Sequence, residues 1–391
     1  MPANARIVRL AAILFATAIG LKGMQAQDPT WEKRLTQGAQ LRQAGRYPEA
    51  EKVYLAALRE AETSGSQDGY LARASNDLAV LYWAQGRYAE AEPLYRRALA
   101  LFEKLYGPAN LAAAATLHNL AELCRQEGKY TEAEKFGRRA LATRTALLGS
   151  EHPATGMSMN TLAGIYYHQG RYAKAEAESK QALSILEKAP DRQSDLATVL
   201  GNLAEIDRRL RKLAEAEGLA QRALTIQQKV FGPSHSDVAK SLNQIAAIHY
   251  DQGRDREAEA LWRRALDIQE RILGPDHPHV AVILINLAEG NRVQGHLAEA
   301  ESLCLQGLGI QERALGPDHP LVASTLANLA SLYRSMKRKP EAKKLEERAR
   351  AILAKHAGEN QPQHTVDIRE LGLRPRVKRK RTNPPSPPAG F

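Results

Sequence analysis

One short turn recurs along this 391-residue chain at a nearly constant interval. A Gly followed by a basic residue and usually an aromatic residue marks it, as in Gly86-Arg87-Tyr88 and Gly170-Arg171-Tyr172. Steps of 41 or 42 residues separate the Gly positions, which are 45, 86, 128, 170, 211, 253, 295 and 337, with Arg211 and Lys337 in place of Gly. A fixed period of this length is typical of a repeat architecture, and eight copies cover residues 29–357 approximately.

Each copy contains two segments whose apolar residues recur at helical spacing, one on each side of the turn. In the second segment, two positions seven residues apart hold small side chains, which lie on one helical face and let a partner helix approach closely. These small-residue slots hold Ala50, Ala91, Ala133, Ala175, Ala216, Ala258, Ala300 and Ala342, then Ala57, Ala98, Ala140, Ala182, Ala223, Ala265, Gly307 and Ala349. A helical hairpin of this kind cannot bury both of its faces alone, so copies must stack. We therefore predict an all-α fold, a right-handed superhelical α-solenoid of about eight helix-turn-helix hairpins.

The composition agrees with helices and excludes several classes of protein. Strong helix formers dominate and aromatic residues make up 5% of the chain. The two cysteines, Cys124 and Cys304, fall in core slots of the repeat, so we expect them to be buried and unreactive rather than part of a disulfide framework or metal site. The formal net charge is +11, but the two ends carry most of it, which does not indicate a broad nucleic-acid-binding face on the body.

The small-residue slots, the Leu-Ala…Tyr pattern and the Gly-basic-Tyr turn resemble tetratricopeptide repeats (TPRs). The 42-residue period, second segments such as "GRYAEAEPLYRRALAL" and the connector "LGPDHP" are similar to the repeats of the kinesin light chain class. The resemblance covers more than four fifths of the chain. It implies an inner groove that binds peptides. The chain lacks a long heptad segment and has an export-type N-terminus, so motor-cargo function is not implied.

The connector "LGPDHP" occurs at 273–278 and again at 315–320. One interpretation is a duplicated site, but equivalent points in stacked hairpins should lie about 10 Å apart, too far for one metal to bind both histidines. We interpret the connector as a structural boundary. Gly274 and Gly316 would end one helix in the left-handed conformation. Asp276 and Asp318 would cap the next helix, and Pro278 and Pro320 suit its first turn.

Carboxamide side chains gather on the first segment of each copy, just before the Leu-Ala pair, where they should face the inner groove. An amide offers a donor and an acceptor, so a ladder of amides can bind an extended peptide backbone. The candidate groove residues are Asn76, Asp77, His118, Asn119, Asn160, Asn202, Asn243, Gln244, Asn286 and Asn328. The alternative is that these amides stabilise neighbouring helices within the stack.

Arginines follow toward the end of the same segments and could favour acidic ligands through bidentate bonds. They are Arg125, Arg209 and Arg292, together with Arg208 and Arg334. Ordinary solvated arginines are the alternative interpretation.

The N-terminal end of the chain predicts export, and the C-terminal end predicts contact with an anionic surface. Residues 1–26 combine Arg6 and Arg9 with an apolar run from Leu10 to Leu21 and Ala26 at a cleavage position, which predicts a signal peptide and a periplasmic or secreted protein. An uncleaved membrane anchor and a mitochondrial presequence are the alternatives. Residues 358–391 are expected to form a disordered, Pro-rich basic tail. Its cluster of Arg374, Arg376, Lys378, Arg379, Lys380 and Arg381 suits an anionic surface.

Residues 27–357 would thus form the solenoid, and signal, repeats and tail use up the chain without room for a conventional catalytic domain. We expect a non-enzymatic protein–protein interaction scaffold that binds a protein or extended peptide in its concave groove. No cofactor, metal or small-molecule substrate is expected. The alternative function is a tether to an anionic polymer or membrane through the basic tail.

Overall fold

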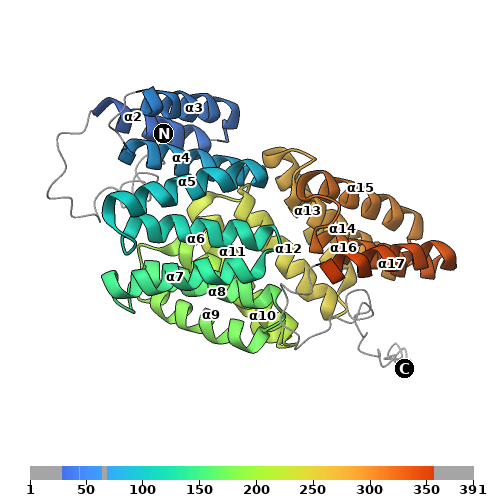
Figure 1. The fold of residues 1–391 in the computed structure, drawn as a ribbon. Helices are drawn as coiled ribbons and strands as arrows, with labels where there is room; N and C mark the ends of the chain where they lie inside the picture. The colour runs from blue at the N-terminus through green and yellow to red at the C-terminus, as the bar shows by residue number, and fades with distance from the viewer. Residues whose placement is uncertain (1–28, 44, 64–67, 356–391) are drawn as a thin grey trace, which may run out of the picture.

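The computed structural model describes residues 29–43, 45–63 and 68–355, and every regular element in these ranges is an α-helix. The helices form eight hairpins, each with a first and a second helix (Figure 1). The first helices are α2 (Pro29–Gln43), α4 (Asp68–Ala84), α6 (Leu111–Gln126), α8 (Pro153–His168), α10 (Gln193–Arg209), α12 (Ser236–Asp251), α14 (Pro278–Gln294) and α16 (Pro320–Ser335). The second helices are α3 (Tyr47–Thr63), α5 (Tyr88–Tyr106), α7 (Tyr130–Leu148), α9 (Tyr172–Glu187), α11 (Leu213–Phe231), α13 (Asp255–Leu273), α15 (Leu297–Leu315) and α17 (Lys339–Lys355).

The two small-residue slots of each second helix lie at the centre of its hairpin, as predicted. All eight alanines of the first slot are at most 1% exposed, and those of the second slot are buried to the same degree. Gly307 shows why large side chains do not fit here. A Cβ atom at this position would lie 2.8 Å from Cγ1 of Ile285 and 3.1 Å from the carbonyl oxygen of Ala281. The two helices of a hairpin therefore approach as closely as their backbones allow.

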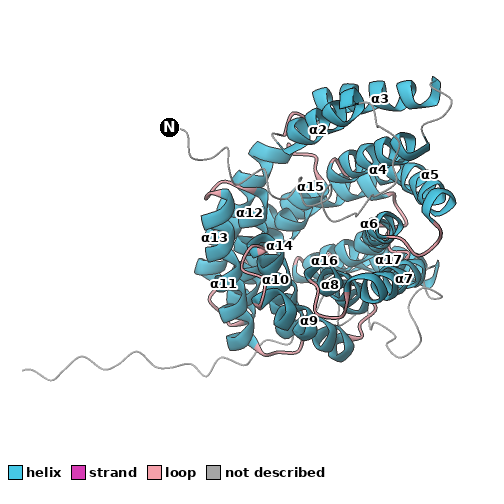
Figure 2. Cartoon of the chain, turned by 90° about the vertical axis from the view of Figure 1, so that its left-hand side faces the viewer, coloured by secondary structure: helices cyan, strands magenta, loops and turns pink. Residues whose placement is uncertain are grey.

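Stacking places the first helices on the inner side of the solenoid. Each first helix contacts the next first helix, whereas the described second helices contact one another only marginally apart from long side chains such as Arg96 and Glu132. The second helices therefore lie at the larger radius, on the outer side. Figure 2 shows the hairpins following one another around a ring, from α2 and α3 through α9 to α13. The α-solenoid predicted from the repeat is confirmed.

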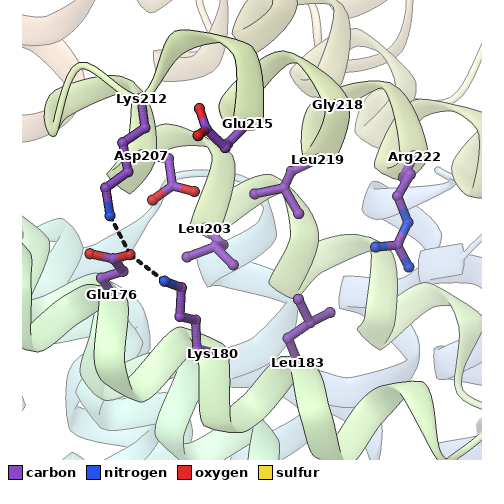
Figure 3. Close-up of a pocket in the computed structure, with 10 residues that line it drawn as sticks. All are labelled: Glu176, Lys180, Leu183, Leu203, Asp207, Lys212, Glu215, Gly218, Leu219 and Arg222. Atoms are coloured by element: carbon purple, nitrogen blue, oxygen red, sulfur yellow. Dashed lines mark hydrogen bonds and ion pairs between the residues drawn. The ribbon is translucent and has the colours of Figure 1, made fainter.

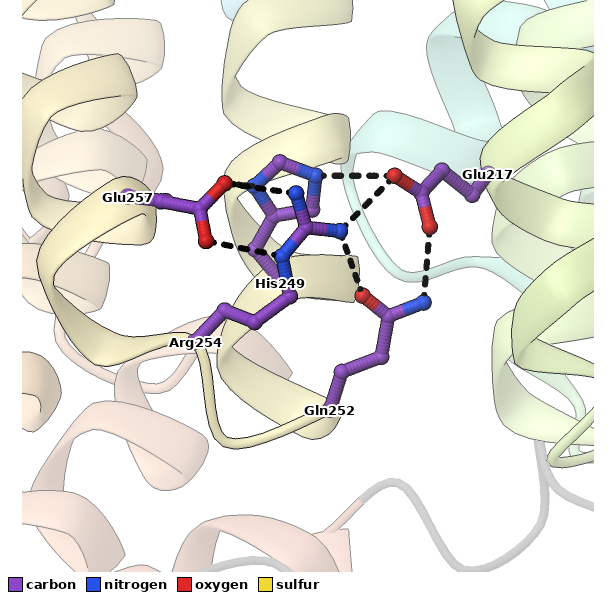
Figure 4. A network of polar contacts seen from close by, with 5 residues as sticks. All are labelled: Glu217, His249, Gln252, Arg254 and Glu257. Carbon is purple, nitrogen blue, oxygen red and sulfur yellow. Dashed lines mark hydrogen bonds and ion pairs between the residues drawn. The ribbon is translucent and has the colours of Figure 1, made fainter. Parts of the chain in front are cut away.

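The basic residue of the recurring turn joins each hairpin to the one before it. At six of the seven junctions its side chain reaches a Glu that directly follows the first small slot of the preceding second helix, at 2.6–2.9 Å. The junction at Glu217 shows how several side chains converge on one junction carboxylate (Figure 4). Its carboxylate accepts from Arg254 at 2.9 Å and Gln252 at 2.8 Å, and it lies 3.1 Å from Nε2 of His249.

These ion pairs align the hairpins more than they stabilise them. Partly exposed pairs contribute about 1 kcal/mol or less each, whereas burying one large apolar side chain contributes about 2 kcal/mol. The hydrogen bond from Gln252, joined by those from Arg254 and His249, lowers the pKa of Glu217 to about 2 against the opposing effect of burial. The charged form of Glu217 is therefore the one that the folded array favours.

The connectors end one helix and begin the next, but not through the residues that the sequence suggested. His277 and His319 are the N-caps, and their Nδ1 atoms accept from the backbone N–H groups of His279 and Leu321 at 3.1 and 3.0 Å. Asp276 and Asp318 precede the cap by one residue. Each instead pairs with a cation 37 residues later, at the end of the second helix of its own hairpin: Asp276 with Arg313 and Asp318 with Lys355, both at 2.6 Å. The prediction that the aspartates cap these helices is wrong.

The glycines of the connectors also differ from the expected conformation. Gly274 and Gly316 have φ of +82° and +87°, but ψ of 162° and 155°, so they are extended rather than left-handed helical. This combination is open to Gly and strained for other residues.

The two identical connectors make contacts between successive turns of the superhelix. Nε2 of His277 lies 3.4 Å from the carbonyl oxygen of Ala84, and Nε2 of His319 lies 2.6 Å from that of Gln126, 193 residues apart in both cases. The following prolines pack on the turn glycines: a Cβ at Gly86 or Gly128 would lie 3.3 or 2.9 Å from Cδ of Pro278 or Pro320. Hairpins seven and eight thus rest on hairpins two and three, and five hairpins complete one turn.

We predict that the double variant His277→Ser, His319→Ser opens the superhelix. Ser is a good N-cap, so the helix starts are kept while the two inter-turn hydrogen bonds, worth about 1 kcal/mol each, are lost. The radius of gyration from small-angle X-ray scattering should increase.

The matched control is His152→Ser, His235→Ser, because these histidines also cap first helices, α8 and α12, through Nδ1. No inter-turn bond of theirs is seen within the described ranges. The same expansion in both double variants, or in neither, would contradict the assignment.

We also predict that acid weakens the array through its junction carboxylates. Because the folded pKa of Glu217 lies below its unfolded value near 4.5, its contribution is complete above about pH 4.5 and disappears as pH falls toward 2. Glu217→Gln should cost about 1 kcal/mol at pH 7 and close to nothing at pH 2, measured by urea unfolding at both pH values. A cost independent of pH would argue against this account.

Candidate functional site

The predicted amide ladder lies on the inner side of the first helices, where most of its members are partly exposed. Its amides bond to one another in pairs across adjacent hairpins. Nδ2 of Asn202 donates to Oδ1 of Asn160 at 3.1 Å, and Nδ2 of Asn286 donates to Oδ1 of Asn243 at 2.9 Å. Asn119 and Asn76 form a longer pair at 3.4 Å. The 42-residue period therefore brings equivalent amides within hydrogen-bond distance.

This pairing supports the alternative role, in which the amides hold neighbouring helices together, and it leaves part of the ladder free. Asn160 is only 4% exposed and belongs to the stack. Each pair uses one donor and one acceptor, so the Oδ1 atoms of Asn202 and Asn286 keep their acceptor capacity on the inner side.

Other candidates on the same surface are engaged in different ways. Nδ1 of His118 lies 3.2 Å from the hydroxyl of Thr161, and burial lowers the pKa of His118 to about 4, so this imidazole is neutral. Burial raises the pKa of Asp77, which accepts one weak bond from Asn76 at 3.3 Å. The side chain of Gln244 lies over Gly201, where a Cβ would come within 3.0 Å of its Oε1. Asn328 is partly exposed.

Four of the predicted arginines contact acids of their own helix, and for Arg209 the distance from Nε to Glu205 is a longer 3.5 Å. Arg125, Arg208 and Arg292 each contact the Glu three residues earlier, which is Glu122, Glu205 or Glu289. Arg208 also pairs with Asp251 of the next hairpin at 2.6 Å and is 5% exposed, so it is a core residue. Nη1 of Arg125 lies 2.9 Å from Nε2 of His168. Arg334, in the last hairpin, pairs with Glu346 at 2.6 Å.

Arg209 is the arginine of this set that remains most available. Its side chain is 43% exposed, and its Nε donates to the hydroxyl of Tyr167 at 2.9 Å. Within the described part of the chain, its two terminal nitrogens have no hydrogen-bond partner. A guanidinium held through Nε with a free terminal edge can bind a carboxylate.

Tyr167 and Glu205 hold Arg209 in place. The hydroxyl of Tyr167 donates to Glu205 at 2.6 Å. Burial acts to raise the pKa of Glu205, but Arg208, Arg209 and Tyr167 together lower it to about 2, so it is ionised. Burial, then Arg125 and Arg209, lower the pKa of the neighbouring His168 to about 3. Sequence reasoning missed Tyr167 and His168, although in the fourth copy they occupy the same positions as Arg208 and Arg209 in the fifth.

The other predictions concern the two cysteines, the two ends of the chain, and metal sites or membrane-spanning helices. Cys124 and Cys304 are buried as predicted, and burial raises the pKa of each thiol to about 12. The predicted signal peptide and the predicted basic tail lie outside the described residues. Within those residues, no three His, Cys, Asp or Glu side chains are grouped to hold a metal ion, and no helix is sufficiently long and apolar to cross a membrane.

Comparison with known protein families identifies the class of protein. A tetratricopeptide repeat model matches residues 33–104, 112–188 and 285–355, which is more than half of the chain. Further tetratricopeptide repeat models match 196–237, 238–279 and 76–147. The chain therefore belongs to the tetratricopeptide repeat family. No curated protein matches it.

Two solved Rap structures share the fold at low sequence identity. A Rap protein complexed with Competence and Sporulation Factor is 14% identical, with a TM-score of 0.63 over 85% of this chain and 99% of the Rap chain. The apo form of RapI is 13% identical, with a TM-score of 0.51 over 72% and 98%. Kinesin light chain TPR-like repeats from Podosopora anserina are 27% identical, with a TM-score of 0.40 over 52% and 98%.

Proposed function

We propose that this protein is a non-enzymatic interaction scaffold whose inner groove binds an extended, acidic peptide or protein segment. Tetratricopeptide repeats serve as scaffolds for protein–protein contact. A Rap protein of the same fold has been solved with Competence and Sporulation Factor. The observation that carries the proposal is that, among the described residues, Oδ1 of Asn202 on α10, Oδ1 of Asn286 on α14 and the terminal nitrogens of Arg209 on α10 have no hydrogen-bond partner on the inner side.

The chemistry of this row suits a peptide in extended conformation. The Oδ1 atoms of Asn202 and Asn286 can accept from backbone N–H groups of any sequence. Arg209, on the helix of Asn202, can bind one carboxylate of the ligand in bidentate geometry. The amides would thus provide affinity and the arginine a preference for Asp, Glu or a chain terminus.

We predict that Asn202→Ala, Asn286→Ala and Arg209→Gln combined weaken binding at least tenfold. Peptides would be selected from a displayed twelve-residue random library on the wild-type protein and measured by fluorescence anisotropy. Each lost hydrogen bond is worth about 1 kcal/mol, and a bond to a charged group more. Selected peptides should contain an acidic residue.

The control is Arg271→Gln, which removes an exposed arginine from the outer helix α13. Circular dichroism should give the same helix content for all variants. If wild-type and triple variant bind the selected peptides equally, the groove is not the binding surface. If neutral peptides dominate the selection, Arg209 does not set a preference for acidic ligands.

We further propose that the protein acts after export, with residues 1–26 as signal, in the periplasm or outside the cell. The alternative function, a tether through the basic residues 374–381, makes a different prediction. Binding to anionic vesicles would then fall steeply with salt and disappear on deletion of residues 372–391, whereas binding of the selected peptides would persist.

A further inference from the structure

Hairpin five differs from the others at one slot of its first helix. Four residues before the recurring turn, hairpins two, four and six place a donor that contacts the junction Glu of the preceding second helix, while hairpins three and seven hold the uncharged Cys124 and Asn291. Tyr82 donates to Glu51 at 3.0 Å and Tyr166 to Glu134 at 3.3 Å, while His249 lies 3.1 Å from Glu217. Hairpin five has Asp207 in this slot. A carboxylate cannot take over the role, because Glu176, the junction Glu it faces, is a carboxylate too.

Asp207 is consequently buried without a partner. It is 4% exposed, and its Oδ1 is inaccessible to solvent and has no hydrogen-bond partner. Glu176 binds Lys180 at 2.5 Å and Lys212 at 2.6 Å. Among the described residues, neither lysine comes within 4.0 Å of the Asp207 carboxylate. Burial, and then the charge of Glu176, raise the pKa of Asp207.

A hollow on the outer side of the solenoid accompanies this exception. It has a volume of about 750 Å³ and lies between α9, α10 and α11 (Figure 3). Its walls combine Leu183, Leu203 and Leu219 with the carboxylates of Asp207 and Glu215. A Cβ added at Gly218 would meet nothing within 4 Å. The equivalent positions in the other copies hold Lys52, Pro93, Lys135, Ala177, Ala260, Ser302 and Lys344, so Gly218 alone lacks a side chain.

A net charge of −1 remains in the lining after internal pairing, because the two lysines on Glu176 leave one positive charge and Asp207 and Glu215 add two negative charges. Glu176 is bound by the two lysines, and Arg222 pairs with Glu187 at 2.9 Å. Asp207 and Glu215 are the charged groups of the lining without an ion-pair partner in the described chain. A buried, unpaired carboxylate destabilises a fold by several kcal/mol unless a cation or donor reaches it. A cationic group on an aliphatic stem would satisfy both the carboxylates and the leucines.

We propose that this hollow is a second binding site, which receives a lysine or arginine side chain of a partner protein on the outer side of the solenoid. The alkyl stem would pack on Leu183 and Leu219, and the ammonium or guanidinium would reach Asp207. The site is separate from the inner groove, so it stands or falls independently of the proposed peptide binding.

The experiment titrates the full-length protein with butylguanidinium and butylammonium, with butan-1-ol as the neutral control. Methyl NMR of Leu183, Leu203 and Leu219 reports occupancy of the hollow. Both cations should give saturable shifts at these methyls, and Asp207→Asn, which keeps the shape of the side chain, should weaken binding at least tenfold. Equal shifts with butan-1-ol, unchanged binding by Asp207→Asn, or no saturable shift would overturn the proposal.

A second variant tests how much Asp207 lowers the stability of the protein when no cation is added. Asp207→Tyr installs the side chain that hairpins two, four and eight carry in this slot. Its hydroxyl should donate to Glu176 and its ring should fill the hollow, so the unfolding temperature should rise by about 2 °C while cation-induced shifts are lost. A fall in unfolding temperature for both Asp207→Tyr and Asp207→Asn would mean that Lys212 pairs with Asp207 in solution, and would overturn the proposal.

Discussion

The close approach of two helices at the small-residue slots is the constraint on which the rest of this structure depends. Alanine or glycine at these positions lets the backbones of each hairpin come together, with side chains such as Ile285 filling the space a larger residue would need. Two helices packed this closely cannot cover the apolar side chains on the two outer faces of their hairpin. These side chains are buried when another hairpin lies on each side. The small-residue slots therefore make stacking of hairpins necessary.

Polar contacts then determine how the hairpins stack. At most junctions, the ion pair between the turn and the preceding junction Glu sets the offset between neighbours. Because every junction rotates the chain in the same sense, small rotations accumulate into a superhelix. After five hairpins, His277 and His319 meet the ends of the first helices of the previous turn. The inner groove is therefore bounded along the axis by the protein itself.

Sequence reasoning reached the hairpins, their number and the buried slots because each depends on neighbours in one copy or the next. Sequence reasoning did not predict the features that depend on contacts between distant residues or on the exact backbone conformation of the connectors. The identical connectors were correctly interpreted as boundaries, but their inter-turn contacts depend on a pitch that is the sum of many small angles. The cap moved from Asp to His because the cap position is set by the extended conformation of Gly274 and Gly316. Asp207 could have been found earlier, since alignment of the Tyr slots isolates it as the one acid.

Urea unfolding of chains containing one, three, five and all eight hairpins, followed by far-ultraviolet circular dichroism, tests the account most directly. If each hairpin depends on its neighbours, a single hairpin is unfolded in water and stability rises with every hairpin added. An isolated hairpin as stable as the whole array would contradict the account.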